Sequence, residues 1–465
     1  MDFDLLIIGA GSAGYNGASL AHSLGLRVGL IDGAAELGGL CILRGCMPSK
    51  ALLAGANRFH QARHSQSFGL QAENSTLDLP TLVARKDEHI RDFADHRRSQ
   101  ILSGRFPFFH SYAIFRDAHT IELTSGPEIG RHLTASTFLI ASGSELAPPT
   151  LPGLADTGFA HSDTVLQATR LPASVVVLGG GAVALEFAWY YHALGSRVTI
   201  LQRSPLLLKG SDATAALALR VALEKSGITV HTGTTLQSAS GTATGKKIIY
   251  LQNDTLHEIE AEEIFYALGR RPRAIGLGLE SANIDLATIR PTQQTNLDHV
   301  FSAGDIVGPY EVVHLAIAQA EISVRNAARL LKHDFALETI DYRSKLFVLF
   351  THPELAQVGF TEQEALDAGH DILTATHPFI DHGKSLVMGE TDGLVKIVAA
   401  RPTGEILGAS VVGPEASSLI QEITTLMHFH GTVRDLLTLP HYHPTLSEIW
   451  TYPAEEIADQ LQSPA

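Results

Sequence analysis

Two stretches of the chain share one pattern of apolar and polar positions. Each has an apolar run, a glycine turn, a mixed segment of helical length and a second apolar run, in residues 3–31 and again in residues 174–202. This pattern predicts strand, turn, helix and strand, the βαβ unit that binds nucleotides. Because the two copies match in order and length, we expect two nucleotide-binding domains.

The rest of the chain predicts further elements around these two units. Polar helical segments occupy roughly residues 45–100, a strand-like stretch residues 110–142, and a long helix residues 313–332. From about residue 338 the pattern changes to strands, as in 345–350 and 393–400, followed by two helices. Repeated βαβ units with a separate mixed C-terminal part indicate an α/β architecture in several lobes.

Composition and charge exclude several classes of protein. The 465 residues are 45% hydrophobic and 18% charged, which predicts about two to four folded domains. The net charge of −15 argues against binding to nucleic acid or to an anionic membrane surface, because both need basic patches. The most apolar stretch, residues 174–195, is interrupted by Glu186 and His192, so we expect a buried strand, turn and helix there and no membrane span.

The chain contains two cysteines, Cys41 and Cys46, with four residues between them. A secreted scaffold held by disulfides would use more cysteines at varied spacing. Asp2 and Asp4 stand where a secretory signal would be basic, so we expect a cytoplasmic protein without a signal peptide. One close pair indicates a dithiol that takes part in chemistry.

The first glycine turn has the spacing of a dinucleotide-binding loop. Gly9, Gly11 and Gly14 form G-x-G-x-x-G between a strand and a helix. The first glycine permits the tight turn, the second lets a pyrophosphate approach, and the third lets helix and strand pack closely. Asp32 ends the next strand, where a ribose hydroxyl needs an acceptor. A turn without a ligand is the alternative, and this context favours nucleotide binding.

The second turn has the same pattern but differs in the residue that would contact the ribose. Its small residues are Gly179, Gly181 and Ala184. Gln202 stands where the first unit has Asp32, and Arg203 and Lys209 follow it. A carboxylate would repel a 2′-phosphate and cations would attract it, so this turn favours NADP over NAD. The alternative is that both cations are ordinary solvated charges.

The two cysteines come soon after the first unit. If a helix begins near Cys41, the two sulfurs lie about one and a half turns apart, and an irregular first turn lets them meet. A helix N-terminus lowers the pKa of a thiol and favours the thiolate needed for exchange. Two buried, unreactive thiols are the alternative, and the position after a dinucleotide loop favours a redox pair.

Eight motifs occur in one order along essentially the whole chain. They are GAGSAG (9–14), GGLCILRGCMPSK (38–50), IASGS (140–144), GGGAVALE (179–186), ALGRRP (267–272), TNLDHVFSAGDIVG (295–308), FTHPELAQVGFTE (350–362) and HYHPTLSE (441–448). In this order they resemble the pyridine nucleotide–disulfide oxidoreductases, which include dihydrolipoyl dehydrogenase, glutathione reductase and mercuric reductase. HYHPTLSE looks most like dihydrolipoyl dehydrogenase.

The resemblance implies two Rossmann-like dinucleotide-binding domains plus a C-terminal α+β dimerisation domain. The implied segments are a first FAD-binding segment (1–145), an NAD(P)-binding domain (146–268), a central FAD-binding segment (269–337) and an interface domain (338–465). Tightly bound FAD would be held by the first turn with Asp32, by Asp305, and by Gly143 and Gly269 in their motifs. No metal site is expected.

The resemblance also implies the catalytic residues of a homodimer. Cys46 matches the sulfur next to the flavin, and Cys41 the sulfur that meets a small-molecule or lipoyl disulfide. Two further pairs match an ion pair near the flavin and an acid–base dyad that serves the partner subunit. They are Lys50 with Glu186, and His443 with Glu448. His441 is not expected to be catalytic.

The sequence says less about which disulfide is the substrate than about the type of reaction. Ser19 and Glu321 stand where glutathione reductases hold glutathione with arginines, which argues against glutathione, and Arg44 between the cysteines is not explained by the family. A dihydrolipoyl-dehydrogenase-like enzyme with an NADP preference fits best, and a mercuric-reductase-like or other NADPH-dependent disulfide reductase is the alternative. A flavin transhydrogenase or a non-catalytic flavoprotein would be expected to lose part of the catalytic set, which is present here.

Overall fold

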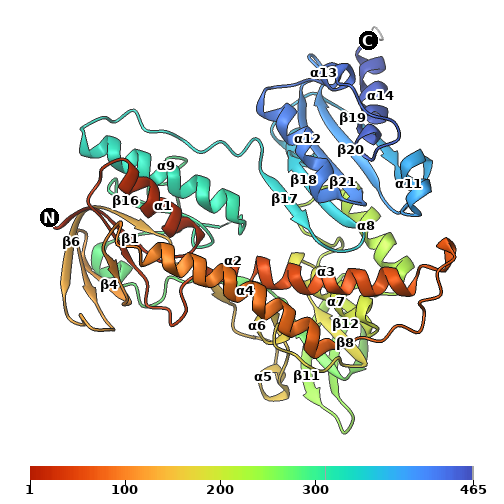
Figure 1. The fold of residues 1–465 in the computed structure, drawn as a ribbon, viewed down its shortest axis with the longest axis horizontal. Helices are drawn as coiled ribbons and strands as arrows, with labels where there is room; N and C mark the ends of the chain where they lie inside the picture. Colours follow the sequence, from red (N-terminus) through yellow and green to blue (C-terminus); the bar gives the residue numbers. More distant parts are fainter. Residues whose placement is uncertain (309, 463–465) are drawn as a thin grey trace. The chain divides into compact units, whose positions relative to one another are not determined.

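The structure is a computed structural model that describes residues 1–308 and 310–462 (Figure 1). These residues form two compact units, each described here by itself. Unit 1 comprises Met1–Ser49, Ala84–Pro148 and Gly269–Asp341, and unit 2 comprises Lys50–Val83, Pro149–Leu268 and the chain from Tyr342 onward. Two long helices, α3 (Cys46–Arg63) and α4 (Leu79–Ile101), contribute residues to both units.

Unit 1 is built on a largely parallel sheet with the strand order β3-β2-β1-β6-β5-β4, and β16 also pairs with β6. Its strands are β1 (Phe3–Ile8), β2 (Val28–Ile31), β3 (Phe108–Phe109), β4 (Ala113–Asp117), β5 (Thr120–Leu123), β6 (His132–Ile140) and β16 (Val300–Ser302). Leu5 and Ile7 belong to one buried cluster and Leu6 and Ile8 to another, so β1 is apolar on both faces. Covering of both faces is typical of parallel strands.

Two helices of unit 1 lie side by side on this sheet, α1 (Ser12–Ser23) and α9 (Val313–Leu331) (Figure 1). Gly17 of α1 faces both the sheet and α9, because a Cβ there would lie 3.1 Å from the side chain of Leu139 in β6 and 3.6 Å from that of Val324 in α9. Smaller elements of unit 1 are α2 (Gly39–Leu43) and the antiparallel pair β7 (Ser144–Leu146) and β15 (Arg270–Pro272). The second turn of α1 thus packs directly on α9.

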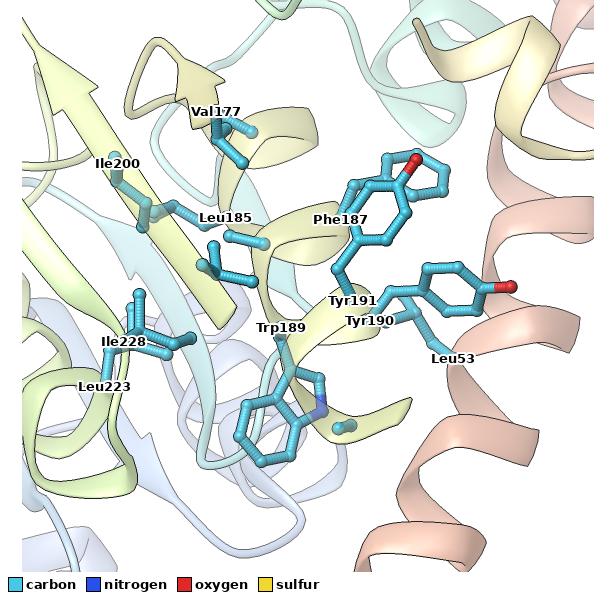
Figure 2. Packing of buried hydrophobic residues seen from close by; sticks show 14 of the residues in the cluster. Leu53, Val177, Leu185, Phe187, Trp189, Tyr190, Tyr191, Ile200, Leu223 and Ile228 are labelled. Carbon is cyan, nitrogen blue, oxygen red and sulfur yellow. The ribbon is translucent and has the colours of Figure 1, made fainter. Parts of the chain in front are cut away.

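Unit 2 contains the second nucleotide-binding unit. The parallel strands have the order β10-β9-β8-β14, beside an antiparallel sheet β11-β12-β13. The elements are α5 (Leu154–Thr157), α6 (Ser162–Val165), β8 (Ser174–Leu178), α7 (Ala182–Leu194), β9 (Arg197–Gln202), α8 (Ala213–Ser226), β10 (Thr229–Thr232), β11 (Thr234–Gly241), β12 (Lys246–Gln252), β13 (Thr255–Ala261) and β14 (Glu263–Tyr266). Figure 2 shows Trp189 and Tyr190 of α7 in the core, with Leu53 of α3. Helix α7 is apolar nearly all round because it is covered on several sides.

The C-terminal part of unit 2 has an antiparallel sheet with the order β17-β18-β21-β20-β19. Its elements are β17 (Leu346–Leu349), β18 (Glu354–Gly359), α10 (Glu362–Asp367), β19 (Ile372–Pro378), α11 (Gly383–Met388), β20 (Leu394–Ala400), β21 (Ile406–Gly413), α12 (Ala416–His428), α13 (Val433–Thr438) and α14 (Thr451–Gln462). Helices α12 and α14 share one buried cluster with this sheet. Lys396 joins this part to α8, because its buried ammonium donates to Asp212 (2.9 Å), the N-cap of α8.

The predicted α/β fold class, with two dinucleotide-binding folds and a C-terminal α+β domain, is confirmed. The boundaries of the four predicted segments stay a prediction. Within residues 1–308 and 310–462, no helix has the length and apolar character needed to cross a bilayer.

Candidate functional site

The first glycine turn, between β1 and α1, requires glycine by its geometry. Gly9 has φ +105°, and a Cβ there would lie 2.3 Å from the carbonyl oxygen of Ala141. A Cβ on Gly14 would lie 1.7 Å from the carbonyl oxygen of Gly9, whereas one on Gly11 would meet only a contact at 3.9 Å. No side chain caps the N-terminus of α1. The turn therefore leaves room at Gly11 and free N–H groups, as a pyrophosphate needs.

Asp32 follows β2 and braces this turn. Its Oδ2 accepts from the backbone N–H of Ala10 at 2.7 Å, and its Oδ1 accepts from the N–H of Ala34 at 2.8 Å. Each carboxylate oxygen has a second lone pair, so both bonds are compatible with a further bond to a ribose hydroxyl. The residues of this turn fit the adenosine half of FAD.

A second group of predicted FAD residues meets where β7 pairs with β15. Asp305 accepts from Ser144 Oγ at 2.8 Å, and Arg270 Nε donates to that hydroxyl oxygen at 2.8 Å. Gly143 and Gly269 flank these strands with φ +74° and +118°. Sequence reasoning missed Glu311, whose pKa is raised by burial and by Asp305, and lowered in part by Arg270. An acidic residue six positions after Asp305 was the available signal.

The cysteines lie on two helices, and the single helix predicted to hold both is wrong. Cys41 is in α2, and α3 begins at Cys46. The chain turns at Arg44, with φ −144°, and a Cβ on Gly45 would lie 3.4 Å from the Cα of Cys41. Residue 45 thus folds back against Cys41 and places Cys46 at a helix N-terminus, where negative charge on sulfur is favoured.

Arg44, which lies between the two cysteines in sequence, has an exposed side chain. Its side chain is 56% exposed and lies 3.7 Å from the carboxylate of Glu36, which is also exposed. Exposed pairs of this kind contribute little to stability because water and salt screen them. Arg44 is therefore a solvated charge.

Lys50 follows Cys46 by one turn of α3 and forms an ion pair with Glu186 of α7. Its Nζ lies 2.9 and 2.8 Å from the two carboxylate oxygens. Glu186 is buried, and it also accepts from the backbone N–H of Phe350 at 3.2 Å. The structure thus brings together two residues far apart in sequence, and their placement near a flavin stays a prediction.

The second glycine turn, between β8 and α7, repeats the geometry of the first. Gly179 has φ +110°, and a Cβ there would lie 2.5 Å from the carbonyl oxygen of Ala267. A Cβ on Gly181 would meet nothing within 4 Å, and no side chain caps α7. Ala184 is buried in the first turn of the helix, where the first unit has Gly14. The turn fits a second dinucleotide.

The residues after this turn fit the predicted NADP preference without testing it. Gln202 is 9% exposed, and its Nε2 donates to the carbonyl oxygen of Leu206 at 3.4 Å. Arg203 and Lys209 are exposed, and neither forms an ion pair with any described residue. Two unpaired cations are thus available near the end of β9.

The predicted acid–base dyad forms within the C-terminal part of unit 2. His443 Nδ1 lies 2.9 Å from Glu448 Oε1, and the imidazole is 80% exposed. Burial raises the pKa of Glu448, but the Thr445 N–H and His443 outweigh it and hold this pKa below its ordinary value. The carboxylate therefore stays charged and can orient the imidazole. His441 instead bonds Glu422 at 2.9 Å, and its lack of a catalytic role stays a prediction.

Sequence reasoning missed His382, a buried histidine next to Glu448 of this dyad. Its Nε2 lies 3.9 Å from Glu448 Oε1 and its Nδ1 2.9 Å from Ser385 Oγ. Burial lowers the pKa of His382, although Glu448 opposes this. No short motif connects residues 66 positions apart, so only the fold reveals this neighbour.

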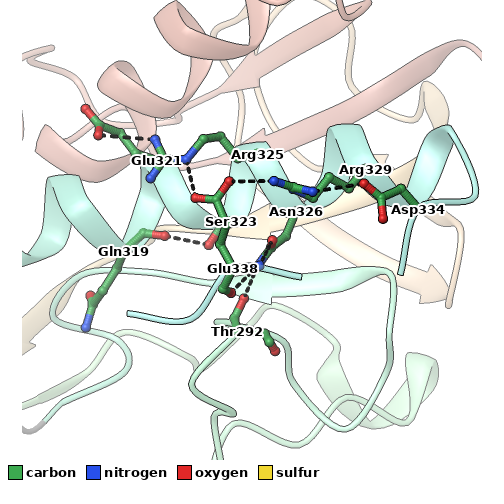
Figure 3. A network of polar contacts seen from close by, with 9 residues as sticks. All are labelled: Thr292, Gln319, Glu321, Ser323, Arg325, Asn326, Arg329, Asp334 and Glu338. Atoms are coloured by element: carbon green, nitrogen blue, oxygen red, sulfur yellow. Dashed lines mark hydrogen bonds and ion pairs between the residues drawn. The ribbon is translucent and has the colours of Figure 1, made fainter. Parts of the chain in front are cut away.

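Glu321, one of the two residues that argued against glutathione, lies in a network of ion pairs around α9 (Figure 3). Glu321 lies 3.5 Å from Arg325, which in turn donates to Glu338 at 2.7 Å. Arg329 bonds the same Glu338 and Asp334. Glu321 is thus already paired with a cation of its own helix.

Comparison with known families matches nearly the whole chain. The family model described as pyridine nucleotide-disulphide oxidoreductase matches residues 3–320. The model of the dimerisation domain of the same family matches residues 347–454.

Curated relatives carry two different names. The chain is 34% identical over 446 residues to the dihydrolipoyl dehydrogenase of Thermus scotoductus, across 93% of this chain and 92% of that protein. It is 32% identical over 438 residues to the mercuric reductase of Bacillus cereus, across 93% of this chain and 68% of that protein.

Among solved structures, the HOCl-induced flavoprotein disulfide reductase RclA from Escherichia coli, in its Cu(II) complex, has a TM-score of 0.83. Its sequence is 24% identical, and the match covers 98% of this chain and 99% of that one. This likeness shows a shared fold.

Proposed function

Since the chain belongs to the pyridine nucleotide-disulphide oxidoreductase family, we propose that it passes electrons between NADPH and a disulfide through Cys41 and Cys46. The family implies FAD and a nicotinamide dinucleotide as cofactors, and its dimerisation domain supports a homodimer. The observation that carries the proposal is the start of α3, where Cys46 opens the helix and Lys50, paired with Glu186, follows one turn later. Cys46 and Lys50 therefore belong to one helix.

Bound FAD would take a hydride equivalent from the nicotinamide and supply two electrons to the cysteine pair. The first turn, Asp32, Ser144 and Asp305 would hold it, and the buried Glu186 keeps the ammonium of Lys50 in place. Gln202, Arg203 and Lys209 support NADPH over NADH, because cations attract a 2′-phosphate.

The chain's own residues then carry out thiol–disulfide exchange. The Cys41 thiolate attacks one sulfur of the substrate, the substrate S–S bond breaks, and the leaving thiolate takes a proton from the partner subunit's His443. The Cys46 thiolate attacks the mixed disulfide, which releases the second thiol and leaves the Cys41–Cys46 disulfide. A dihydrolipoyl substrate would run these steps in reverse, with His443 as the base.

Reduction of the purified holoenzyme by NADPH or dithionite tests the proposal. Two-electron reduction should give a long-wavelength charge-transfer band. This band should be absent in the Cys46→Ser variant and present in the control variant Arg44→Gln. Cys41→Ser should remove disulfide turnover. Absence of the band, together with unchanged turnover in Cys41→Ser, would contradict the proposal.

A mercuric-reductase-like activity is the second candidate, because a mercuric reductase is among the relatives. NADPH oxidation driven by Hg²⁺ and by lipoamide should be compared at equal enzyme concentration. A kcat/KM for Hg²⁺ that exceeds that for every disulfide would favour this candidate.

A further inference from the structure

The guanidinium of Arg97, in α4, lies over the ring of Tyr15, in the first turn of α1. Its Cζ lies 4.0 Å from the ring centroid, within the range of a cation–π contact. Tyr15 is itself fixed, because it is 7% exposed and its hydroxyl accepts from Arg105 Nη2 at 2.7 Å. All three residues belong to unit 1. The guanidinium of Arg97 thus packs on a buried ring.

Among the described residues, no carboxylate forms an ion pair with Arg97. Its Nε and Nη1 are shielded from water and have no hydrogen-bond partner among the residues that the structure describes, which also give it no ion pair. The next residue, Arg98, is 60% exposed and pairs with Asp95 at 3.0 Å. Proteins normally pair a shielded cation, so an unbalanced one indicates a group that awaits an anion.

The first turn of α1 also lies against the start of α2, the helix that holds Cys41. A Cβ on Gly39, in α2, would lie 2.6 Å from the Cα of Gly11, and the backbone N–H of Tyr15 donates to the carbonyl oxygen of Gly11 at 2.9 Å. Arg97 and the helix of Cys41 therefore approach the same turn of unit 1. In agreement with this, burial lowers the pKa of Arg97, while the negative charges that Tyr15 and Cys41 can carry oppose that shift.

We propose that Arg97 selects disulfide substrates that carry a carboxylate near the S–S bond, and that it binds this carboxylate while Cys41 attacks. A guanidinium keeps its charge at all working pH values and can donate two parallel hydrogen bonds to a carboxylate. The assignment rests on the proposed function. In this assignment the cation that binds the substrate comes from α4, and Ser19 and Glu321 have no part in it.

Three small disulfides that differ mainly in charge test the assignment on the NADPH-reduced holoenzyme. They are dithiodiglycolate (anionic), bis(hydroxyethyl) disulfide (neutral) and cystamine (cationic). In Arg97→Gln, kcat/KM for dithiodiglycolate should fall about tenfold or more, mostly through KM, because a charge-assisted hydrogen bond is lost. The neutral disulfide should change less than about twofold, and cystamine should improve. Arg97→Lys should recover part of the loss, and Arg98→Gln should match the unaltered enzyme on all three.

Two results would overturn the assignment. Equal losses on all three disulfides would show that Arg97 supports structure alone, and a lowered flavin content in Arg97→Gln would show that it serves the cofactor. If the unaltered enzyme gives the charge-transfer band but reduces the three disulfides with no preference for the anion, the assignment fails while the proposed function stands. If it gives neither band nor turnover, both fail.

Discussion

The two glycine turns of this chain have one sequence plan and two different outcomes at the end of the following strand. In the first, Asp32 faces back to the turn and bonds the backbone of Ala10 and Ala34. In the second, Gln202 bonds the carbonyl of Leu206 and leaves the exposed Arg203 as the nearest charge in sequence. The comparison teaches that two turns with the same glycine geometry can differ in charge at the end of the next strand, and we expect that difference to decide which ribose each turn accepts.

The largest effect is expected at the third small residue of each turn. Gly14→Ala would place a methyl group 1.7 Å from a backbone oxygen, so the turn must shift. We expect a loss of stability of about 3 kcal/mol, and loss of bound flavin. The second turn already has Ala184 there, so Ala184→Gly should cost about 1 kcal/mol and keep flavin. Thermal unfolding measures the stability of each variant, and flavin absorbance after desalting measures its bound flavin. Equal losses in the two variants would contradict the expected difference between the two turns.

A smaller effect is expected when the second turn is given the charge of the first. Gln202→Glu would place a carboxylate near a 2′-phosphate and should lower kcat/KM for NADPH about tenfold, or about 1.4 kcal/mol. The value for NADH should change less than about threefold, since a carboxylate accepts from free ribose hydroxyls. Arg203→Ala should act in the same direction, and steady-state kinetics with both coenzymes measures the ratio. A preference of the unaltered enzyme for NADH above about tenfold would contradict the NADP assignment.

The smallest expected effect is on the pH dependence of stability, which we expect to depend on a histidine of unit 2. In unit 2, His60 packs on Trp189 and on His64 at 4.1 Å between ring centroids. Burial, with the nearby His64, His352 and His192, lowers the pKa of His60 to about 3. An unfolded histidine titrates near 6.5, so as pH falls below 6.5 the unfolded chain binds the proton first, and stability is lost.

The slope cannot exceed about 1.4 kcal/mol per pH unit, and partial exposure reduces it. His60→Gln should therefore lose about 1 kcal/mol less stability than the unaltered protein between pH 7 and pH 5, as measured by urea unfolding at each pH. The exposed His96, in unit 1, offers a control, because His96→Gln should keep the original pH dependence. Identical pH profiles for all three proteins would exclude His60 as the cause.

Much of this molecule was predictable because its signals are local. Strands, helices and turns of both nucleotide-binding units follow from periodicity and from glycines that no other residue could replace, such as Gly9. The pairing of Lys50 with Glu186 was expected from a family resemblance alone, since 136 positions separate them. The spacing of residues gives no information on such contacts.

What could not be predicted depends on tertiary packing or on very short elements. Helix α2 has five residues, fewer than two turns, so periodicity cannot separate it from α3. Arg97 reaches Tyr15 and His382 reaches Glu448 only because distant helices and loops fold together. Arg97 and Arg98 look alike in sequence, and only the fold shows that Arg98 has a carboxylate partner whereas Arg97 has none within residues 1–308 and 310–462.

The turn at Gly45 also bears on how long a reaction intermediate can survive. With residue 45 folded against Cys41, the two thiols are joined by a tether of a few residues, which acts as a high effective concentration of one thiol for the other. A mixed disulfide on Cys41 would then be resolved by Cys46 faster than by thiols in solution. External thiols at millimolar levels would compete poorly with a neighbour built into the same loop.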